Sequence, residues 1–170
     1  MTEVTTAAPR WLDPREQAAW RAYLEMNAKL SARLNREMQG QFGLSISDFS
    51  VLVQLSEHVD ARMRVLELAR ALDWEKSRLS HQLTRMQQRG LIERSNCNED
   101  RRGAFVVLTD QGRATVEAAA PHHVESVRTL LFDGLSAEQV EAWDSISRAV
   151  LARLEAGCTG LAEAPETPGD

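Results

Sequence analysis

The sequence predicts a mainly α-helical fold with a small β-hairpin wing, in which a winged helix-turn-helix is flanked by dimerisation helices. Three observations predict it. A short helical pattern over residues 64–72 is followed, after the break at Asp73-Trp74, by a second one over residues 75–89. A polar, basic hairpin pattern follows at residues 91–108. Long amphipathic segments precede and follow this central part.

The second helical pattern has an apolar face and a polar face. Leu79, Leu83 and Met86 recur at three- and four-residue steps and therefore share one side of a helix. The other side carries hydrogen-bonding groups and cations, namely Ser77, Arg78, Ser80, His81, Thr84, Arg85 and Gln88. It carries no carboxylate, whereas a helix face that is only solvated usually pairs acidic with basic residues. This composition favours duplex DNA as the partner, because such a helix fits the major groove.

The hairpin is predicted from two strand-forming segments, residues 91–97 and 104–108, and the polar segment that joins them. Gly90 precedes the hairpin and is expected to end the second helix, since glycine tolerates the left-handed conformation. The tip carries Asp100, Arg101 and Arg102. The negative potential of the minor groove attracts arginine, so we predict that this wing contacts DNA.

Capping patterns mark the starts of three further helices at residues 13–16, 45–48 and 136–139. The first helix is expected to run from Pro14 to about Met38, and Phe49, Leu52 and Leu55 should face inward from the second. Residues 110–132 predict another helix, which Pro121 should kink.

One domain of ordinary size is predicted at residues 13–156, with the winged helix-turn-helix at 44–112. The ends, residues 1–12 and 157–170, are expected to be mobile. Residues 13–43 and 113–156 are interpreted as dimerisation helices, because one small domain offers too little surface for their apolar stripes and a palindromic site needs two DNA-binding units. The alternative is that these stripes close a monomeric core.

Charge is unevenly distributed along the chain. The whole chain of 170 residues has a net charge of -5, but residues 62–103 carry ten Arg or Lys against six Asp or Glu. Phosphates respond to the local field, so a basic DNA-binding face is compatible with an acidic body. No apolar run approaches the roughly 20 residues of a membrane span and no signal peptide is recognisable. We therefore expect a cytoplasmic protein without membrane contact.

Several motifs resemble the MarR family of bacterial winged helix-turn-helix transcription regulators. They are Glu67-Leu-Ala69, Arg89-Gly-Leu-Ile92, Asp100-Arg-Arg102 and Val107-Leu-Thr-Asp-Gln-Gly112, and Trp74-Glu-Lys-Ser-Arg-Leu-Ser-His81 is similar to the actinobacterial members. The resemblance covers roughly residues 13–156. The sequence departs from the family pattern at Glu75, where the family more often has a Ser, Thr or Asp cap.

The resemblance implies which residues contact DNA and what controls them. The recognition-helix contacts would fall on Ser77, Arg78, Ser80 and His81, and the wing arginine would be Arg102, oriented by Asp100. It also implies a small, often aromatic or anionic effector between the dimer helices and the DNA-binding unit. The predicted function is that of a ligand-responsive repressor that binds pseudo-palindromic operators as a homodimer.

Other interpretations remain as alternatives. The winged helix could bind a partner protein, or Cys97 could make the chain a DNA-binding redox sensor, although packing or neutral exposure is favoured for this thiol. Trp20, Tyr23 and Trp74 could line a ligand pocket, and core packing is favoured for each. The chain has no phosphate-binding glycine loop, zinc-protease motif or nucleophile elbow, so we predict no enzyme and no cofactor. Adjacent histidines such as His122 and His123 point about 100° apart on a helix, so no metal site is predicted.

Overall fold

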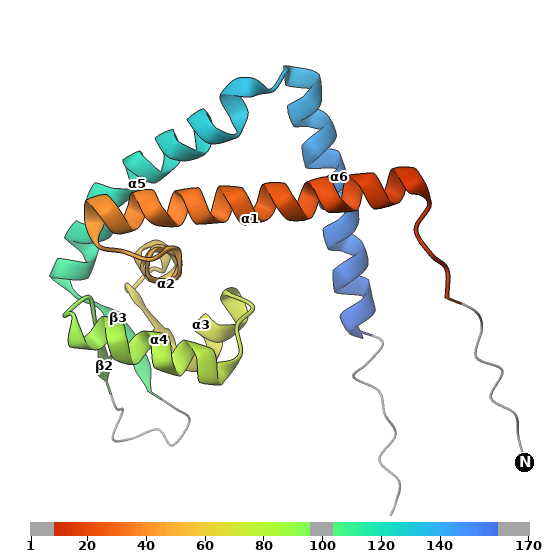
Figure 1. Cartoon of the computed structure of the whole chain (residues 1–170). Coiled ribbons are helices and arrows are strands. Elements are labelled where there is room, and N and C mark those ends of the chain that lie inside the picture. Colours follow the sequence, from red (N-terminus) through yellow and green to blue (C-terminus); the bar gives the residue numbers. More distant parts are fainter. Residues whose placement is uncertain (1–8, 96–103, 160–170) are drawn as a thin grey trace, which may run out of the picture. The chain divides into compact units, whose positions relative to one another are not determined.

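The computed structural model describes residues 9–95 and 104–159, with side chains through residue 156. Its elements in chain order are α1 (Pro14–Phe42), α2 (Ile46–Glu57), β1 (Arg62–Arg64), α3 (Val65–Ala71), α4 (Lys76–Gln88), β2 (Ile92–Ser95), β3 (Phe105–Leu108), α5 (Asp110–Leu130), the 3-10 helix η1 (Phe132–Gly134) and α6 (Ala137–Thr159) (Figure 1). The predicted mainly helical fold with a small sheet is confirmed. The chain divides into two compact units, the first ending at Ser126 and the second beginning at Val127.

The ends of α1 follow from local hydrogen bonds. The Asp13 carboxylate accepts from the backbone N–H of Arg15 at 2.7 Å and of Glu16 at 2.8 Å, while the Glu16 carboxylate accepts from the Asp13 N–H at 2.9 Å. This reciprocal pair is the capping box that the sequence predicts. The helix continues past the predicted end near Met38 to Phe42, because Gly43 closes it in the left-handed conformation.

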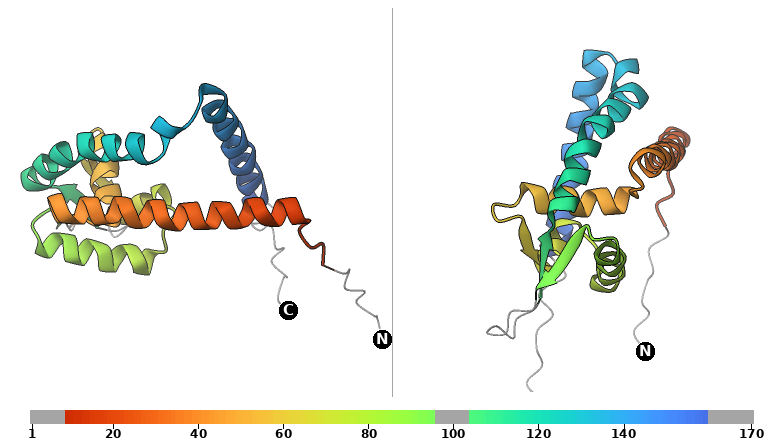
Figure 2. Two further views of the ribbon diagram at one scale, coloured as in Figure 1. Left: turned by 45° about the horizontal axis from the view of Figure 1, so that its top comes forward. Right: turned by 90° about the vertical axis from the view of Figure 1, so that its left-hand side faces the viewer.

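The core of the first unit lies among α2, α3, α4 and the sheet. Its fully buried side chains include Leu44, Leu52, Leu55, Leu68, Leu79, Leu83, Met86, Ile92 and Val106. Helix α2 contacts both α1 and α4, so it lies between them (Figures 1 and 2). The predicted inward faces of α2 and α4 are confirmed, since Phe49, Leu52 and Leu55 on the one and Leu79, Leu83 and Met86 on the other are buried.

The sheet has three antiparallel strands in the order β1-β3-β2. Met63 and Arg94, on the outer strands, both pair with Val106 of the central strand. The β2-β3 hairpin is the predicted wing, although β2 ends at Ser95. Strand β1 was not predicted, because it has three residues of which two are arginines. Its extended form depends on pairing with β3 and on burial of Met63. The residues next to Met63 in the sequence reveal neither.

Helix α5 runs without a break across Pro121 and contributes to both units. In the second unit, Ser136 and Gln139 form the predicted cap of α6: the Ser136 N–H donates to Gln139 Oε1 at 2.8 Å, and the Gln139 N–H donates to Ser136 Oγ at 3.3 Å. None of the helices in the described part of the chain is both long and apolar enough to cross a membrane.

Candidate nucleic-acid interface

Helix α4 turns its apolar face to the core and its polar face to solvent. Leu79, Leu83 and Met86 are fully buried, while the exposed side chains include Ser77, Arg78, Ser80, His81, Thr84 and Arg85. An open groove of about 620 Å³ runs along this face and is lined by Ser47, Arg78, His81, Gln82, Thr84, Arg85 and Gln88. The predicted contact residues on α4 are therefore accessible from one side of the first unit. The groove combines cations with neutral donors and acceptors, the groups that suit base edges and phosphates.

The start of α4 is held by Trp74 instead of a capping side chain. Glu75 occupies the N-cap and makes no side-chain cap hydrogen bond, which agrees with the departure seen in the sequence. The Trp74 N–H donates to the Ala69 carbonyl at 2.9 Å, and its half-buried ring packs against the core. The Arg78 guanidinium lies over this ring, 4.3 Å from the ring centroid. Trp74 thus packs as the sequence favours and also orients a cation of the exposed face.

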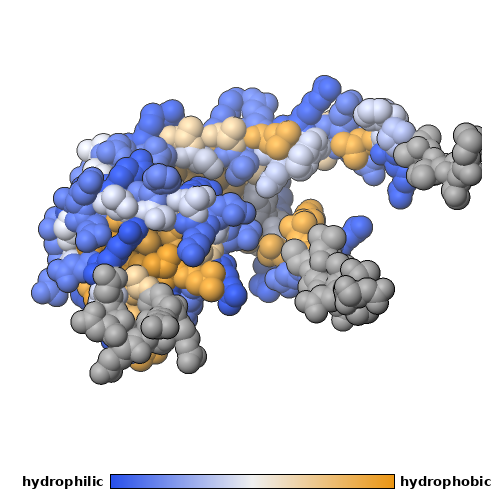
Figure 3. All heavy atoms as spheres, turned by 90° about the horizontal axis from the view of Figure 1, so that it is seen from below, coloured by the Kyte–Doolittle hydropathy of each residue, from blue (hydrophilic) through white to orange (hydrophobic). Residues whose placement is uncertain are grey.

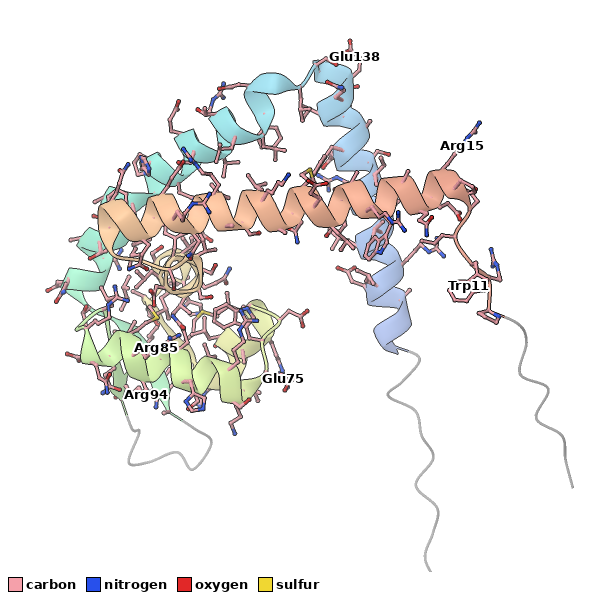
Figure 4. The ribbon with its side chains drawn as sticks, viewed as in Figure 1. Trp11, Arg15, Glu75, Arg85, Arg94 and Glu138 are labelled. Atoms are coloured by element: carbon pink, nitrogen blue, oxygen red, sulfur yellow. The ribbon has the colours of Figure 1, made fainter. Side chains whose placement is uncertain are left out.

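The sheet carries arginines on both of its faces, with Arg94 on the side of α4 and Arg62 and Arg64 on the other side. Arg94 on β2 donates from Nη2 to the Ser80 carbonyl at 2.9 Å, which ties the wing to α4. Figure 4 shows Arg85 and Arg94 toward one end of α4 and Glu75 at the other. On β1, Arg62 and Arg64 lie 5.3 and 4.7 Å from the centre of the Phe105 ring. These three arginines were counted in the basic segment but not assigned to the site, because their placement requires the unpredicted strand β1 and the fold of the wing.

A buried polar pair supports α4 from behind. Asp48 at the start of α2 is 4% exposed and Gln82 on α4 is 3% exposed. The Gln82 amide donates from Nε2 to Asp48 Oδ1 at 2.5 Å. Arg89 donates from Nη1 to Asp48 Oδ2 at 3.0 Å and from Nη2 to the Gly43 carbonyl at 2.7 Å. The Asp48 carboxylate therefore links the start of α2 to the middle and the C-cap of α4, and Arg89 extends this link to Gly43 at the end of α1. The sequence indicated Asp48 only as part of the capping pattern at residues 45–48 and gave no signal that it pairs with Gln82.

Two predicted aromatic positions need correction. Trp20 and Tyr23 were favoured as core residues, but their exposed fractions are 51% and 48%, and their rings stack on each other with centroids 5.6 Å apart. The core interpretation is wrong for both, because this part of α1 extends away from the buried cluster of the first unit, which α1 joins through Met38 and Phe42. A helical stripe in the sequence does not show whether its partner surface belongs to the same chain.

The histidine pair packs against aromatic rings. His122 and Phe42 have ring centroids 5.6 Å apart, and His123 and Phe49 have centroids 4.7 Å apart. Burial, followed by the neighbouring charge of His122, lowers the pKa of His123 below its ordinary value. Across residues 9–95 and 104–156, no group of three or more metal-ligating side chains is found. Cys97, Asp100, Arg101 and Arg102 lie outside the described residues.

Comparison with known proteins agrees with this geometry. Residues 44–103 match the sequence model of the MarR family. The crystal structure of AbsC, a MarR family transcriptional regulator from Streptomyces coelicolor, is 44% identical, covers 87% of this chain and 99% of AbsC, and superposes with a TM-score of 0.80. The chain belongs to the MarR family. As a member, it is a winged helix-turn-helix transcription regulator, and the predicted family and fold are confirmed.

Two further relatives add functional context. Sco3205, a MarR family transcriptional regulator from the same organism whose structure was solved in complex with DNA, is 38% identical, with 85% of this chain and 94% of Sco3205 covered and a TM-score of 0.80. The transcriptional repressor YetL of Bacillus subtilis is 28% identical over 105 residues, which are 60% of this chain and 63% of YetL. The match thus spans less than two thirds of that repressor. A family of transcription regulators agrees with the prediction that the chain is not an enzyme.

Proposed function

We propose that this MarR-family regulator is a repressor that binds pseudo-palindromic duplex DNA as a homodimer, in the cytoplasm, through the exposed face of α4. The observation that carries the proposal is the burial pattern of that helix. Its three large apolar residues are locked in the core, so the carboxylate-free face with Arg78, His81 and Arg85 is held outward on a rigid scaffold. A relative that is 38% identical was solved in complex with DNA, which supports the same use here.

The exposed apolar side chains support a dimer. On α1 and the residues before it they are Trp11, Leu12, Trp20, Tyr23 and Leu24, and on α6 they are Trp143, Ile146, Val150, Leu151 and Leu154. Figure 3 shows hydrophobic residues at the surface along α1. Exposed apolar patches on a single chain mark interaction surfaces, and two-fold homodimers are the commonest assembly. A dimer also supplies the two recognition helices that a palindrome requires, about 34–36 Å apart.

Phosphates and the minor groove complete the proposed DNA contact. Arg94 lies on strand β2 of the wing, and Arg62 and Arg64 lie on β1, which pairs with the wing strand β3. We propose that Arg101 and Arg102, with Asp100 as the orienting partner, continue it at the tip and enter the minor groove. The face on α4, made of Ser77, Arg78, Ser80, His81, Thr84 and Arg85, would contact base edges and phosphates in the major groove.

The test is a DNA titration with two classes of variant. Fluorescence anisotropy with a duplex selected by the wild-type protein should give an affinity that falls steeply as salt rises, because bound arginines release counterions. Arg78→Ala or His81→Ala should cost about 1 to 3 kcal/mol on the preferred base pair and relax specificity there. Arg102→Ala should weaken binding to all sequences. As a control, Arg148→Ala removes a cation of α6 that is paired with Asp144 and should leave base specificity unchanged.

Binding that is indifferent to salt would contradict DNA as the partner and would favour the protein-interaction module. Equal losses on every sequence for the helix and wing variants would show that α4 reads no bases.

We also propose that a small-molecule effector controls DNA binding, with Trp20, Tyr23 and Trp74 as candidate contacts. The stacked rings of Trp20 and Tyr23 are accessible, which supports this assignment more for them than for Trp74, whose ring already faces Arg78. An effector acts only if its affinity differs between the conformation that binds DNA and the one that does not. Operator must therefore weaken effector binding by the same factor by which effector weakens operator binding. Calorimetric titration of a stabilising ligand with and without operator DNA measures the factor by which operator changes the affinity for the ligand. A ligand whose affinity ignores operator is no effector, and oxidation of Cys97 would then be tested by mass spectrometry.

A further inference from the structure

The buried side of α4 contains a polar residue whose outer end reaches the DNA-binding face. Gln82 is 3% exposed, yet it also lines the groove beside Arg85. Its amide nitrogen donates inward to Asp48 Oδ1 at 2.5 Å. Its amide oxygen accepts a hydrogen bond from Arg85 Nη2. The three side chains thus form a continuous series of hydrogen bonds, here called the relay, from the core to the exposed face.

The inner end of this chain is fixed by the surroundings of Asp48. Its second oxygen, Oδ2, accepts from the Ser45 N–H and the Ser45 hydroxyl, both at 2.8 Å, and from Arg89 Nη1 at 3.0 Å. These three donors hold the carboxylate in one rotamer. A carboxylate with 4% exposure that receives four hydrogen bonds is satisfied and has little freedom to turn.

The amide of Gln82 therefore has one allowed orientation. If it were turned by 180°, its oxygen would face Asp48 Oδ1 and its NH₂ group would face the guanidinium of Arg85. The first contact would oppose two acceptors and the second would oppose two donors. Because a carboxylate accepts and a guanidinium donates, Gln82 must place its oxygen outward, where it accepts from Arg85.

We propose that Asp48 and Gln82 are positioning residues that fix the guanidinium of Arg85 for contact with DNA. The proposal rests on the proposed function and names a determinant of its base specificity. A free arginine side chain has many rotamers, and ordering it on binding costs affinity. Gln82 holds one of the five N–H groups of Arg85. Arg85 therefore meets the DNA in a defined direction and keeps its other donors for a base edge or a phosphate.

The experiment compares four full-length variants on duplexes selected from a random pool by the wild-type protein. Gln82→Met keeps the length of the side chain and removes both hydrogen bonds of the amide. Arg85→Ala removes the positioned cation. The double variant Gln82→Met/Arg85→Ala tests whether the two act together. Gln87→Met is the matched control, since Gln87 is exposed on the same helix and does not line the groove.

Gln82→Met should lower affinity for the selected duplex about fivefold, the equivalent of one hydrogen bond. The loss should fall on the same base pairs that Arg85→Ala affects, and the salt dependence should stay that of wild type because the charge remains. The double variant should bind no more weakly than Arg85→Ala, since the relay has nothing left to position. Gln87→Met should match wild type.

Asp48→Asn is a second, independent variant that leaves both Gln82 and Arg85 in place. The asparagine oxygen is expected to face the donors of Ser45 and Arg89, so its NH₂ group faces Gln82. Gln82 must then turn its own oxygen inward and present NH₂ to Arg85, which reverses the relay. The loss should again be about fivefold, at the base pairs read by Arg85.

The outcomes separate this proposal from the proposed function. If the wild-type protein binds no duplex, both fail. If wild type binds with sequence preference but Gln82→Met and Asp48→Asn weaken every duplex equally, or if Gln82→Met loses as much in the Arg85→Ala background as alone, the two residues only stabilise the fold and the relay is refuted. If Gln82→Met does not fold, Asp48→Asn decides by its base-pair profile. If neither folds, the pair is structural and the proposal is overturned.

Discussion

Gly112 at the start of α5 lies against Leu91, three residues after the end of α4, and adding one methyl group at Gly112 tests this contact. Gly112 is buried in the first turn of α5, and a Cβ added there would lie 2.0 Å from the Leu91 carbonyl oxygen and 2.9 Å from Leu108 Cδ1. The first distance is about 1.5 Å shorter than the roughly 3.5 Å at which heavy atoms attract each other. The oxygen belongs to the backbone, so no side-chain rotation relieves the clash. Gly112→Ala must push α5 away from Leu91.

That displacement breaks specific hydrogen bonds. The Gly112 N–H donates to Thr109 Oγ1 at 2.9 Å, and the Thr109 hydroxyl donates to the Gly90 carbonyl at 2.7 Å. Overpacking costs about 1–3 kcal/mol and each lost hydrogen bond about 1 kcal/mol. We therefore expect Gly112→Ala to lower the free energy of unfolding by about 3–5 kcal/mol. Because Gly90, with φ of 72°, closes the recognition helix, DNA affinity should fall with it.

Gly40→Ala is the matched control. Gly40 lies inside α1, and a Cβ there meets no atom within 4 Å. Alanine is the better helix former, so this substitution should raise the free energy of unfolding by about 0.5–1 kcal/mol. Urea unfolding followed by circular dichroism, at one fixed protein concentration, measures both. Equal effects of the two substitutions, or a loss below about 1 kcal/mol for Gly112→Ala, would refute the close approach as its cause.

Three further results are expected. Burial lowers the pKa of His123 below its ordinary 6.5, so the unfolded chain binds the proton more readily and the free energy of unfolding should fall as the pH drops below about 6.5. His123→Gln should remove this part of the loss when urea unfolding is compared near pH 7.5 and 5.5. An unchanged pH profile would contradict the assignment. Ile146 is 66% exposed, so Ile146→Glu should leave the stability of a monomer nearly unchanged but weaken a homodimer by about 1.5–3 kcal/mol for each buried copy. Sedimentation equilibrium measures the strength of the dimer. An unaltered dimer would exclude the apolar face of α6 around Ile146 as the interface. Arg94→Ala should cost about 1 kcal/mol of stability by releasing β2 from the Ser80 carbonyl, whereas Arg94→Ala with wild-type stability would show that this bond contributes nothing.

The sequence determined the features that depend on neighbours along the chain. Apolar spacing at three and four residues placed Leu79, Leu83 and Met86 on one side of α4, because an α-helix repeats every 3.6 residues whatever surrounds it. Capping boxes at Asp13 and Ser45 marked helix starts because the cap bonds only to the first turn. These local rules were sufficient for the fold class, for helix α4 and for the residues that share its polar face.

Tertiary structure decided what depends on residues far apart in sequence. Asp48 and Gln82 are 34 positions apart, and only packing of α2 against α4 makes them a buried pair instead of two ordinary polar side chains. Strand β1 exists because β3 supplies its hydrogen bonds, and its length of three residues leaves no periodic signal. Trp20 has the same apolar character whether its partner is the core or another surface. Burial is a property of the assembled chain, and periodicity specifies only which residues share a face.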